Sequence, residues 1–180
     1  GDNIKGIDRC GMAKAKLQSY DLTQLNILVL EKHVLIRQLL TDVFRIFGVA
    51  TVQSTSDPDK AFKMFQAFPS DVVLTDWTYD LDGLDFVERI RKDPDTPNPS
   101  VPIIVTTANT RIEHVKVARD IGMTEFLTKP ISAKLLYSRI AAVVEDQRHY
   151  IRVGDFFGPD RRRRNGDEHI GIERRRASLF

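Results

Sequence analysis

The sequence predicts an α/β fold, in which five β-strands and five α-helices alternate within one domain over residues 25–149. Short aliphatic runs are followed by longer segments of helical periodicity. The first run is apolar enough for a strand that is covered on both faces. Because parallel strands need a crossover helix between them, the alternation implies a doubly wound parallel five-stranded sheet with helices on both faces.

Strands are expected where aliphatic residues cluster over four to six positions. Leu25–Leu30 is the clearest of these runs, and Val49–Gln53 is a weaker one that follows the first helix. The remaining strands are expected at 71–75, 101–106 and 125–128. Each run is short, as is usual for the strands of a globular protein.

Helices are expected where apolar residues recur on one helical face. In the segment 34–47 these positions include Ile36, Leu40 and Phe47, and Gly48 ends the helix. An Asp-Pro pair opens the second helix, with the aspartate as N-cap and the proline in the first turn. The expected helices are 34–47, 57–68, 84–91, 110–121 and 132–148.

The composition excludes several classes of protein. The chain has 180 residues, of which 42% are hydrophobic and 29% charged, and this is ordinary for a globular chain. Its longest apolar runs are far shorter than the ~20 residues of a membrane-spanning helix. Cys10 is the single cysteine and cannot form an internal disulfide. Residues 1–24 are polar and lack a signal-peptide core, so we expect a flexible leader and a cytoplasmic location.

Residues 150–180 are expected to form an Arg-rich tail outside the folded domain. From 151 to 180 the sequence holds eight Arg and five acids, with a short repeat at 158–164 and 171–176. A basic run can indicate nucleic-acid binding. Here acids are interspersed and no recognition helix follows the domain, so we expect a solvated tail and no DNA-binding domain. Its six large apolar residues favour docking onto the body or onto a partner.

Polar side chains follow the predicted strands where those strands end. Glu31 and Lys32 follow the first strand, Asp76 the third, Thr107 the fourth and Lys129 the fifth. In open parallel sheets ligands bind beyond the carboxyl ends of the strands. An aspartate that can attack phosphorus, with an ammonium and a hydroxyl to hold phosphoryl oxygens, suits phosphoryl transfer to a carboxylate.

The chain resembles the receiver domain of two-component response regulators, which has a flavodoxin/CheY-like fold, over about Leu25–Asp146. The motifs that carry the resemblance are Asp76-Trp77, Asp82-Gly83-Leu84, Val101-Pro102 with Thr107-Ala108, and Phe126-Leu127-Thr128-Lys129-Pro130. The resemblance implies that a histidine kinase or a phosphotransfer protein phosphorylates Asp76. It also implies that Thr107 and Phe126 relay the change to a surface that binds a downstream protein partner.

The sequence departs from the receiver pattern around the expected metal site. The family usually has two adjacent acids after the first strand, whereas here Lys32 follows Glu31. The loop after Asp76 is also shorter than usual and lacks the Met-Pro pair. The resemblance implies Mg²⁺ ligands at Asp76, Glu31 and the carbonyl of Thr78, and we expect weak or absent Mg²⁺ binding. Lys32 either pairs with Asp76 or points away into solvent.

Three functions are compatible with these residues in different degrees. The first is a stand-alone receiver that is switched by phosphorylation and is not itself an enzyme. The second is a pseudo-receiver, a binding module that keeps the fold without Mg²⁺-dependent phosphorylation. The third is a phosphatase with an aspartyl nucleophile. This third function would need a second aspartate as general acid two residues after Asp76, where the sequence has Thr78.

Overall fold

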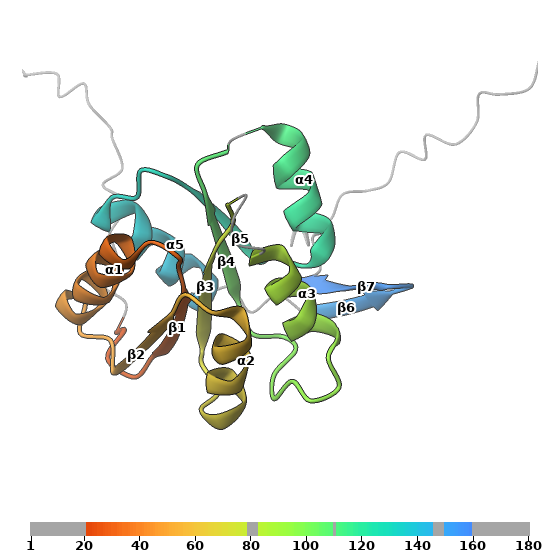
Figure 1. The fold of residues 1–180 in the computed structure, drawn as a ribbon, viewed down its shortest axis with the longest axis horizontal. Coiled ribbons are helices and arrows are strands. Elements are labelled where there is room, and N and C mark those ends of the chain that lie inside the picture. Colours follow the sequence, from red (N-terminus) through yellow and green to blue (C-terminus); the bar gives the residue numbers. More distant parts are fainter. Residues whose placement is uncertain (1–20, 79–82, 110, 146–149, 160–180) are drawn as a thin grey trace, which may run out of the picture.

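The computed structural model describes residues 21–78, 83–109, 111–145 and 150–159 and contains one main sheet of five parallel strands (Figure 1). The strands are β1 (Asn26–Leu30), β2 (Thr51–Thr55), β3 (Val72–Asp76), β4 (Ile103–Thr107) and β5 (Glu125–Thr128). The helices are α1 (Val34–Ile46), α2 (Pro58–Ala67), α3 (Gly83–Lys92), α4 (Ile112–Ile121) and α5 (Ala133–Glu145). The sheet order is β2-β1-β3-β4-β5. The predicted doubly wound parallel fold is therefore confirmed.

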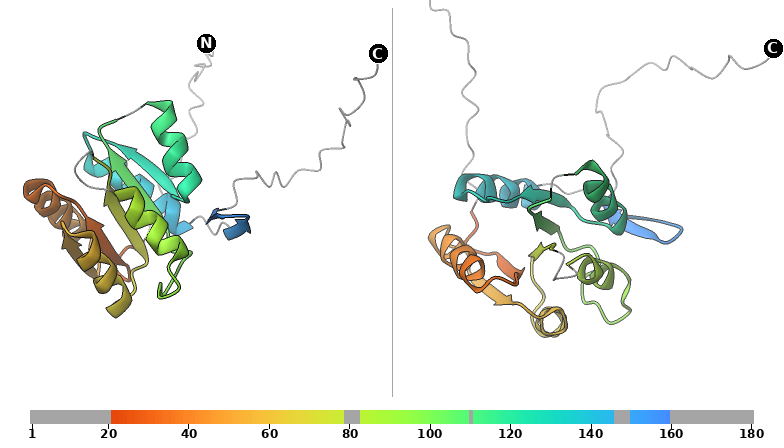
Figure 2. Two further views of the ribbon diagram at one scale, coloured as in Figure 1. Left: turned by 45° about the vertical axis from the view of Figure 1, so that its right-hand side comes forward. Right: turned by 45° about the horizontal axis from the view of Figure 1, so that its top comes forward.

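Helices cover both faces of the sheet and enclose two apolar cores (Figure 2). On one face α1 and α5 pack with residues such as Phe44 and Ile140, and on the other α2, α3 and α4 pack with residues such as Phe62 and Ile90. Every residue of the central strands β3 and β4 is buried, because helices lie on both sides of them. Within the described ranges, no helix is both long enough and apolar enough to cross a membrane.

Some element boundaries differ from the predicted ones for local reasons. The second strand was expected from Val49, but β2 begins at Thr51. Val49 is buried, and its N–H donates to the carbonyl of Phe44, so it belongs to the close of α1. The fourth strand was expected from Val101, but Pro102 has no N–H to donate and β4 begins at Ile103.

The register of the sheet aligns the carboxyl ends of its strands. Leu30 of β1 lies opposite Thr75, Asp76 of β3 lies opposite Thr106, and Thr107 of β4 lies opposite Thr128. Residues that directly follow these positions therefore emerge at one edge of the sheet. That edge is where the sequence placed its candidate functional residues.

A β-hairpin at 150–159 differs from the predicted tail. β6 (Tyr150–Val153) and β7 (Phe156–Pro159) pair antiparallel, and β7 packs against α3 and α4. Gly154 supplies the positive φ, +57°, that a tight turn between two strands requires. Residues 150–159 of the expected tail therefore form a hairpin, and its second strand packs against the domain. Residues 160–180, and residues 1–20 of the leader, lie outside the described residues.

Candidate functional site

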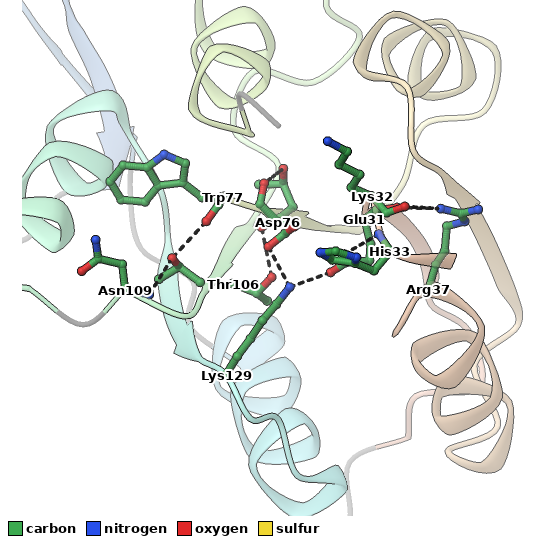
Figure 3. Close-up of polar contacts among 11 residues, drawn as sticks. Glu31, Lys32, His33, Arg37, Asp76, Trp77, Thr106, Asn109 and Lys129 are labelled. Atoms are coloured by element: carbon green, nitrogen blue, oxygen red, sulfur yellow. Dashed lines mark hydrogen bonds and ion pairs between the residues drawn. The ribbon is translucent and has the colours of Figure 1, made fainter. Parts of the chain in front are cut away.

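Three charged side chains meet at the carboxyl edge of the sheet (Figure 3). The Lys129 ammonium, after β5, donates to Glu31 Oε2 at 2.9 Å and to Asp76 Oδ1 at 2.8 Å. Glu31 and Asp76 are each 1% exposed. Lys129 thus bridges two buried carboxylates at the carboxyl ends of β1 and β3, and the three side chains carry a net charge of −1 when all are ionised.

Burial and hydrogen bonding together set the protonation of this cluster. Burial raises the pKa of Asp76; the hydrogen bond from Lys129 opposes that rise, and the charge of Glu31 adds to it. For Lys129, burial alone would lower the pKa, but its hydrogen bonds to Asp76 and Glu31 outweigh this effect and raise it. Lys129 is therefore charged at neutral pH, and it partly compensates a carboxylate that burial disfavours.

The loop between β1 and α1 holds Glu31 in place. Glu31 Oε1 accepts the backbone N–H of His33 at 2.9 Å, and the Arg37 guanidinium donates to the Glu31 carbonyl at 2.7 Å. Arg37 also reaches the Lys32 carbonyl at 3.4 Å. These contacts hold the Glu31 carboxylate in the position from which it binds Lys129.

One oxygen of Asp76 is left without a partner. Asp76 Oδ2 is buried and accepts no hydrogen bond from the described residues, although an unpaired buried acceptor is costly. The start of α3 lies directly over this residue. A Cβ at Gly83 would overlap the backbone carbonyl of Asp76, so only glycine fits there. The first turn of α3 therefore packs on the backbone of Asp76, whose Oδ2 accepts no hydrogen bond from the described residues.

The hydroxyl of Thr107 makes its hydrogen bonds to backbone groups and not to the charged side chains of the cluster. Its Oγ1 donates to the carbonyl of Trp77 at 3.0 Å and accepts the N–H of Asn109 at 3.1 Å. The Trp77 ring lies 5.0 Å, centroid to centroid, from the ring of His114 in α4. Sequence reasoning placed Thr107 at this edge but missed its link to Trp77 and α4, since neither contact has a sequence signal.

The structure separates the two alternatives for Lys32. This residue is exposed, and its side chain points away from the Lys129 ammonium (Figure 3). Among the described residues, the ion pairs of Glu31 and Asp76 are both made by Lys129. Lys32 therefore does not hold the place of a cation between the carboxylates, which Lys129 occupies.

Phe126 and Thr78 lie close to this edge without joining the cluster. Phe126 is half-buried and packs against the core under α3 and α4. The Thr78 hydroxyl oxygen is buried and has no hydrogen-bond partner within the described part of the chain. The roles expected for both residues stay predictions.

The oxygen donors suit a hard cation such as Mg²⁺ only in part. Over the described ranges, no group of three or more His, Cys, Asp and Glu side chains is placed to hold a metal. Glu31 and Asp76 both bind Lys129, and Mg²⁺ prefers a nearly complete octahedron of oxygens. Within the described residues, Asp76 Oδ2 is the one oxygen of this carboxylate pair without a hydrogen-bond partner, and it is buried.

Known proteins share this fold and this stretch of sequence. The family described as "Response regulator receiver domain" matches residues 27–141. Chemotaxis protein CheY-3 of Vibrio cholerae is 25% identical over 122 residues, which cover 67% of this chain and 92% of that protein. The probable transcriptional regulator ycf27 of Guillardia theta is 32% identical over 135 residues, 74% of this chain and 51% of that protein.

Solved structures give the same answer for the fold. Chemotaxis protein CheY4 of Vibrio cholerae has a TM-score of 0.60 at 23% identity, covering 67% of this chain and 98% of its own. A putative response regulator from Chloroflexus aurantiacus has a TM-score of 0.62 at 21% identity, over 68% and 99% of the two chains. With the family match spanning most of the sheet and the strand-end cluster, this chain belongs to the response regulator receiver domain family.

Proposed function

We propose that this chain accepts a phosphoryl group on Asp76 from a histidine kinase or a phosphotransfer protein and thereby switches a surface that binds a downstream protein. The observation that carries this proposal is the state of the Asp76 carboxylate. Lys129 fixes Oδ1, while Oδ2 is buried and accepts no hydrogen bond within the described part of the chain. A carboxylate held in this way has one oxygen oriented as a nucleophile.

In the proposed reaction Asp76 Oδ2 attacks the phosphorus of a phosphohistidine. The new O–P bond makes an acyl phosphate, the P–N bond breaks, and the released imidazole takes its proton from solvent. Lys129 lies at the carboxylate and stabilises charge on the transferred phosphoryl oxygens. A bound Mg²⁺ would neutralise part of that charge, with Asp76, Glu31 and the Thr78 carbonyl as its ligands.

The donor protein has an apolar surface available beside the site. A groove starts at Lys129 and Pro130 and runs between α1 and the start of α5, over Ile36, Leu39, Leu40 and Leu136. Leu35 and Leu39 on α1 are 80% and 58% exposed. Exposed apolar residues of this kind favour a protein contact, and contact here would bring a donor histidine to the edge that holds Asp76.

The proposed switch begins at Thr107. Its hydroxyl is now on the carbonyl of Trp77, so binding a phosphoryl oxygen requires it to leave that carbonyl. The half-buried Phe126 of β5 lies on the same side of the sheet as α4 and can respond to that change. Movement at these two residues would alter the surface around α4 and β5.

A pseudo-receiver is the second candidate, and it is favoured by the incomplete set of metal donors among the described residues. Intact-mass spectrometry after incubation with acetyl phosphate or phosphoramidate, with and without Mg²⁺, separates the two. We expect the wild type to gain the mass of one phosphoryl group and Asp76→Asn to gain none. If the wild type gains no mass from either small donor or from a cognate phosphorylated kinase, the pseudo-receiver is correct.

A further inference from the structure

We propose that α4 mechanically couples the β6–β7 hairpin to the Asp76 site, so that docking of the hairpin and the state of the site are linked. The hairpin lies at one end of α4, next to α3, in all three ribbon views (Figures 1 and 2). The Trp77–His114 contact lies near the other end of the helix. The link to phosphorylation rests on the proposed function, whereas the mechanical link does not.

The hairpin is seated through two glycines that leave no room for side chains. A Cβ on Gly122, the C-cap of α4, would lie 2.5 Å from the carbonyl oxygen of Phe157. A Cβ on Gly158 would lie 3.0 Å from the Cα of Gly122 and 2.7 Å from Cζ of Phe156. Backbone thus packs on backbone here, and Gly158 and Pro159 are buried. Such a close approach specifies one docked position.

A buried arginine underlies the same seat. Arg91 of α3 is 1% exposed; its Nε donates to the Gly122 carbonyl at 3.0 Å and its NH1 to the Pro99 carbonyl at 2.7 Å. At the hairpin turn the Asp155 carboxylate is close enough to contribute to the raised pKa of Lys92, for which Glu88 is the main cause. The arginine thus ties α3 to the C-cap residue of α4, and β7 of the hairpin packs against both helices.

Between its two ends α4 is held only lightly. Ala118 is its one fully buried residue, while Ile112 and Val117 are 69% and 47% exposed. A ten-residue helix is about 15 Å of stiff rod. Because few core contacts fix its middle, its position depends on the contacts at each end. A shift at Gly122 is therefore expected to reach His114.

The N-terminal part of α4 contacts the residue that follows Asp76. His114 stacks on Trp77, which follows Asp76 in the chain, and the carbonyl of Trp77 accepts the Thr107 hydroxyl. Release of Thr107 from that carbonyl would free Trp77 to move against α4. Since coupling between two sites is reciprocal, undocking the hairpin must also affect the site.

The first test needs no phosphodonor. Trp77 is the only tryptophan, so its emission reports the α4 contact. We compare Gly158→Ala and the larger Gly158→Leu, which push the hairpin off its seat, with the matched control Val153→Ala, a 66% exposed site near the hairpin turn. Hydrogen exchange over 150–159 measures docking.

We expect hydrogen exchange in the hairpin to rise at least about tenfold in the Gly158 variants, which corresponds to ~1.4 kcal/mol. The Trp77 emission should shift with it, and Val153→Ala should change neither. Two results would overturn the proposal. Faster exchange in the hairpin with unchanged Trp77 emission would mean that α4 does not couple the two sites. Unchanged exchange even in Gly158→Leu would mean that the packing of Gly158 on Gly122 does not hold the hairpin.

The second test asks whether phosphorylation uses the same link. Hairpin exchange in the wild type is compared before and after incubation with a phosphodonor, with Asp76→Asn as control. We expect a change only in the wild type. Phosphorylated wild type with unchanged hairpin exchange refutes the link to phosphorylation while the proposed function stands. Absence of phosphoryl mass refutes the proposed function, and the fluorescence comparison still decides the mechanical coupling.

Discussion

Replacing Lys129 with methionine tests how the charged cluster contributes to stability. Methionine keeps much of the length of lysine but removes the ammonium that bridges Glu31 and Asp76 at 2.9 and 2.8 Å. The two carboxylates, each 1% exposed, would then face one another without a cation. Breaking a buried ion pair by removing one partner costs about 3–5 kcal/mol. Lys129 keeps a side-chain exposure of 15%, so we take the lower value, ~3 kcal/mol.

Thermal unfolding measures this loss. For a chain of this length 1 kcal/mol corresponds to about 2–4 °C, so we expect Lys129→Met to lower Tm by about 6–12 °C at pH 7. The matched control is Lys134→Met in α5, an exposed lysine outside the charged cluster, whose effect should stay within about 0.5 kcal/mol. A Tm for Lys129→Met within about 2 °C of the control would show that the bridge does not stabilise the fold.

The pH dependence of this variant has a defined sign. Lys129 has a raised folded pKa, so its stabilising contribution is present below its unfolded value of 10.5 and is lost as the pH rises through the folded value. The carboxylates that it leaves behind can be neutralised by protons. The Tm difference between Lys129→Met and the wild type should therefore shrink as the pH is lowered from neutrality. A difference that grows on acidification would refute this account.

Three further predictions follow from the same edge of the sheet. Burial raises the folded pKa of Asp76 above 3.8, so ionisation of this carboxyl costs stability as the pH rises through that pKa. Asp76→Asn should therefore raise Tm at neutral pH, and the gain should disappear on acidification. A Tm below that of the wild type at pH 7 would contradict this. Gly83→Ala should lower the free energy of unfolding by about 1–3 kcal/mol in denaturant titration, because its Cβ would meet the Asp76 carbonyl, and an unchanged midpoint would mean that α3 shifts freely. Trp77 emission should change little with Mg²⁺ in the wild type but show a saturable change in Lys32→Asp, which restores a carboxylate; saturation of the wild type at physiological Mg²⁺ would refute the weak metal site.

The fold could be predicted because its signals are local and repeated. Each helix carries its own periodicity, and the Asp57-Pro58 start appears in the structure as the N-terminal cap of α2. Gly48, the predicted stop of the first helix, directly follows the C-cap of α1 with a positive φ of 79°. The hairpin was missed although Gly154-Asp155 between apolar strands is a turn signal, because the neighbouring arginines favoured a solvated tail. The prediction rested on the composition of residues 150–180 as a whole, which does not reveal a hairpin in the first ten of them.

The site could be predicted as a set of residues but not as a set of contacts. That Glu31, Asp76 and Lys129 meet follows from the ends of parallel strands alone. The direction in which a side chain turns depends on partners that the sequence does not order. Lys32 therefore stayed undecided until its exposure was known, and the Thr107 hydroxyl was expected to face the phosphoryl site rather than the Trp77 carbonyl.

Charge explains why the metal question decides between a receiver and a pseudo-receiver. Before transfer the cluster of Glu31, Asp76 and Lys129 is close to balance, with a net charge of −1. An acyl phosphate on Asp76 would replace one negative charge by about two, and Lys129 alone would then face Glu31 and the phosphoryl group together. Charges in a buried site of low dielectric repel strongly, so this state needs a second cation. A chain that binds Mg²⁺ weakly therefore either requires more Mg²⁺ to be phosphorylated or works through contacts that need no phosphoryl group. The proposed coupling of α4 to the hairpin would serve a chain of the second type. Its contacts, between Trp77 and His114 and between Gly122 and Gly158, exist without a phosphoryl group.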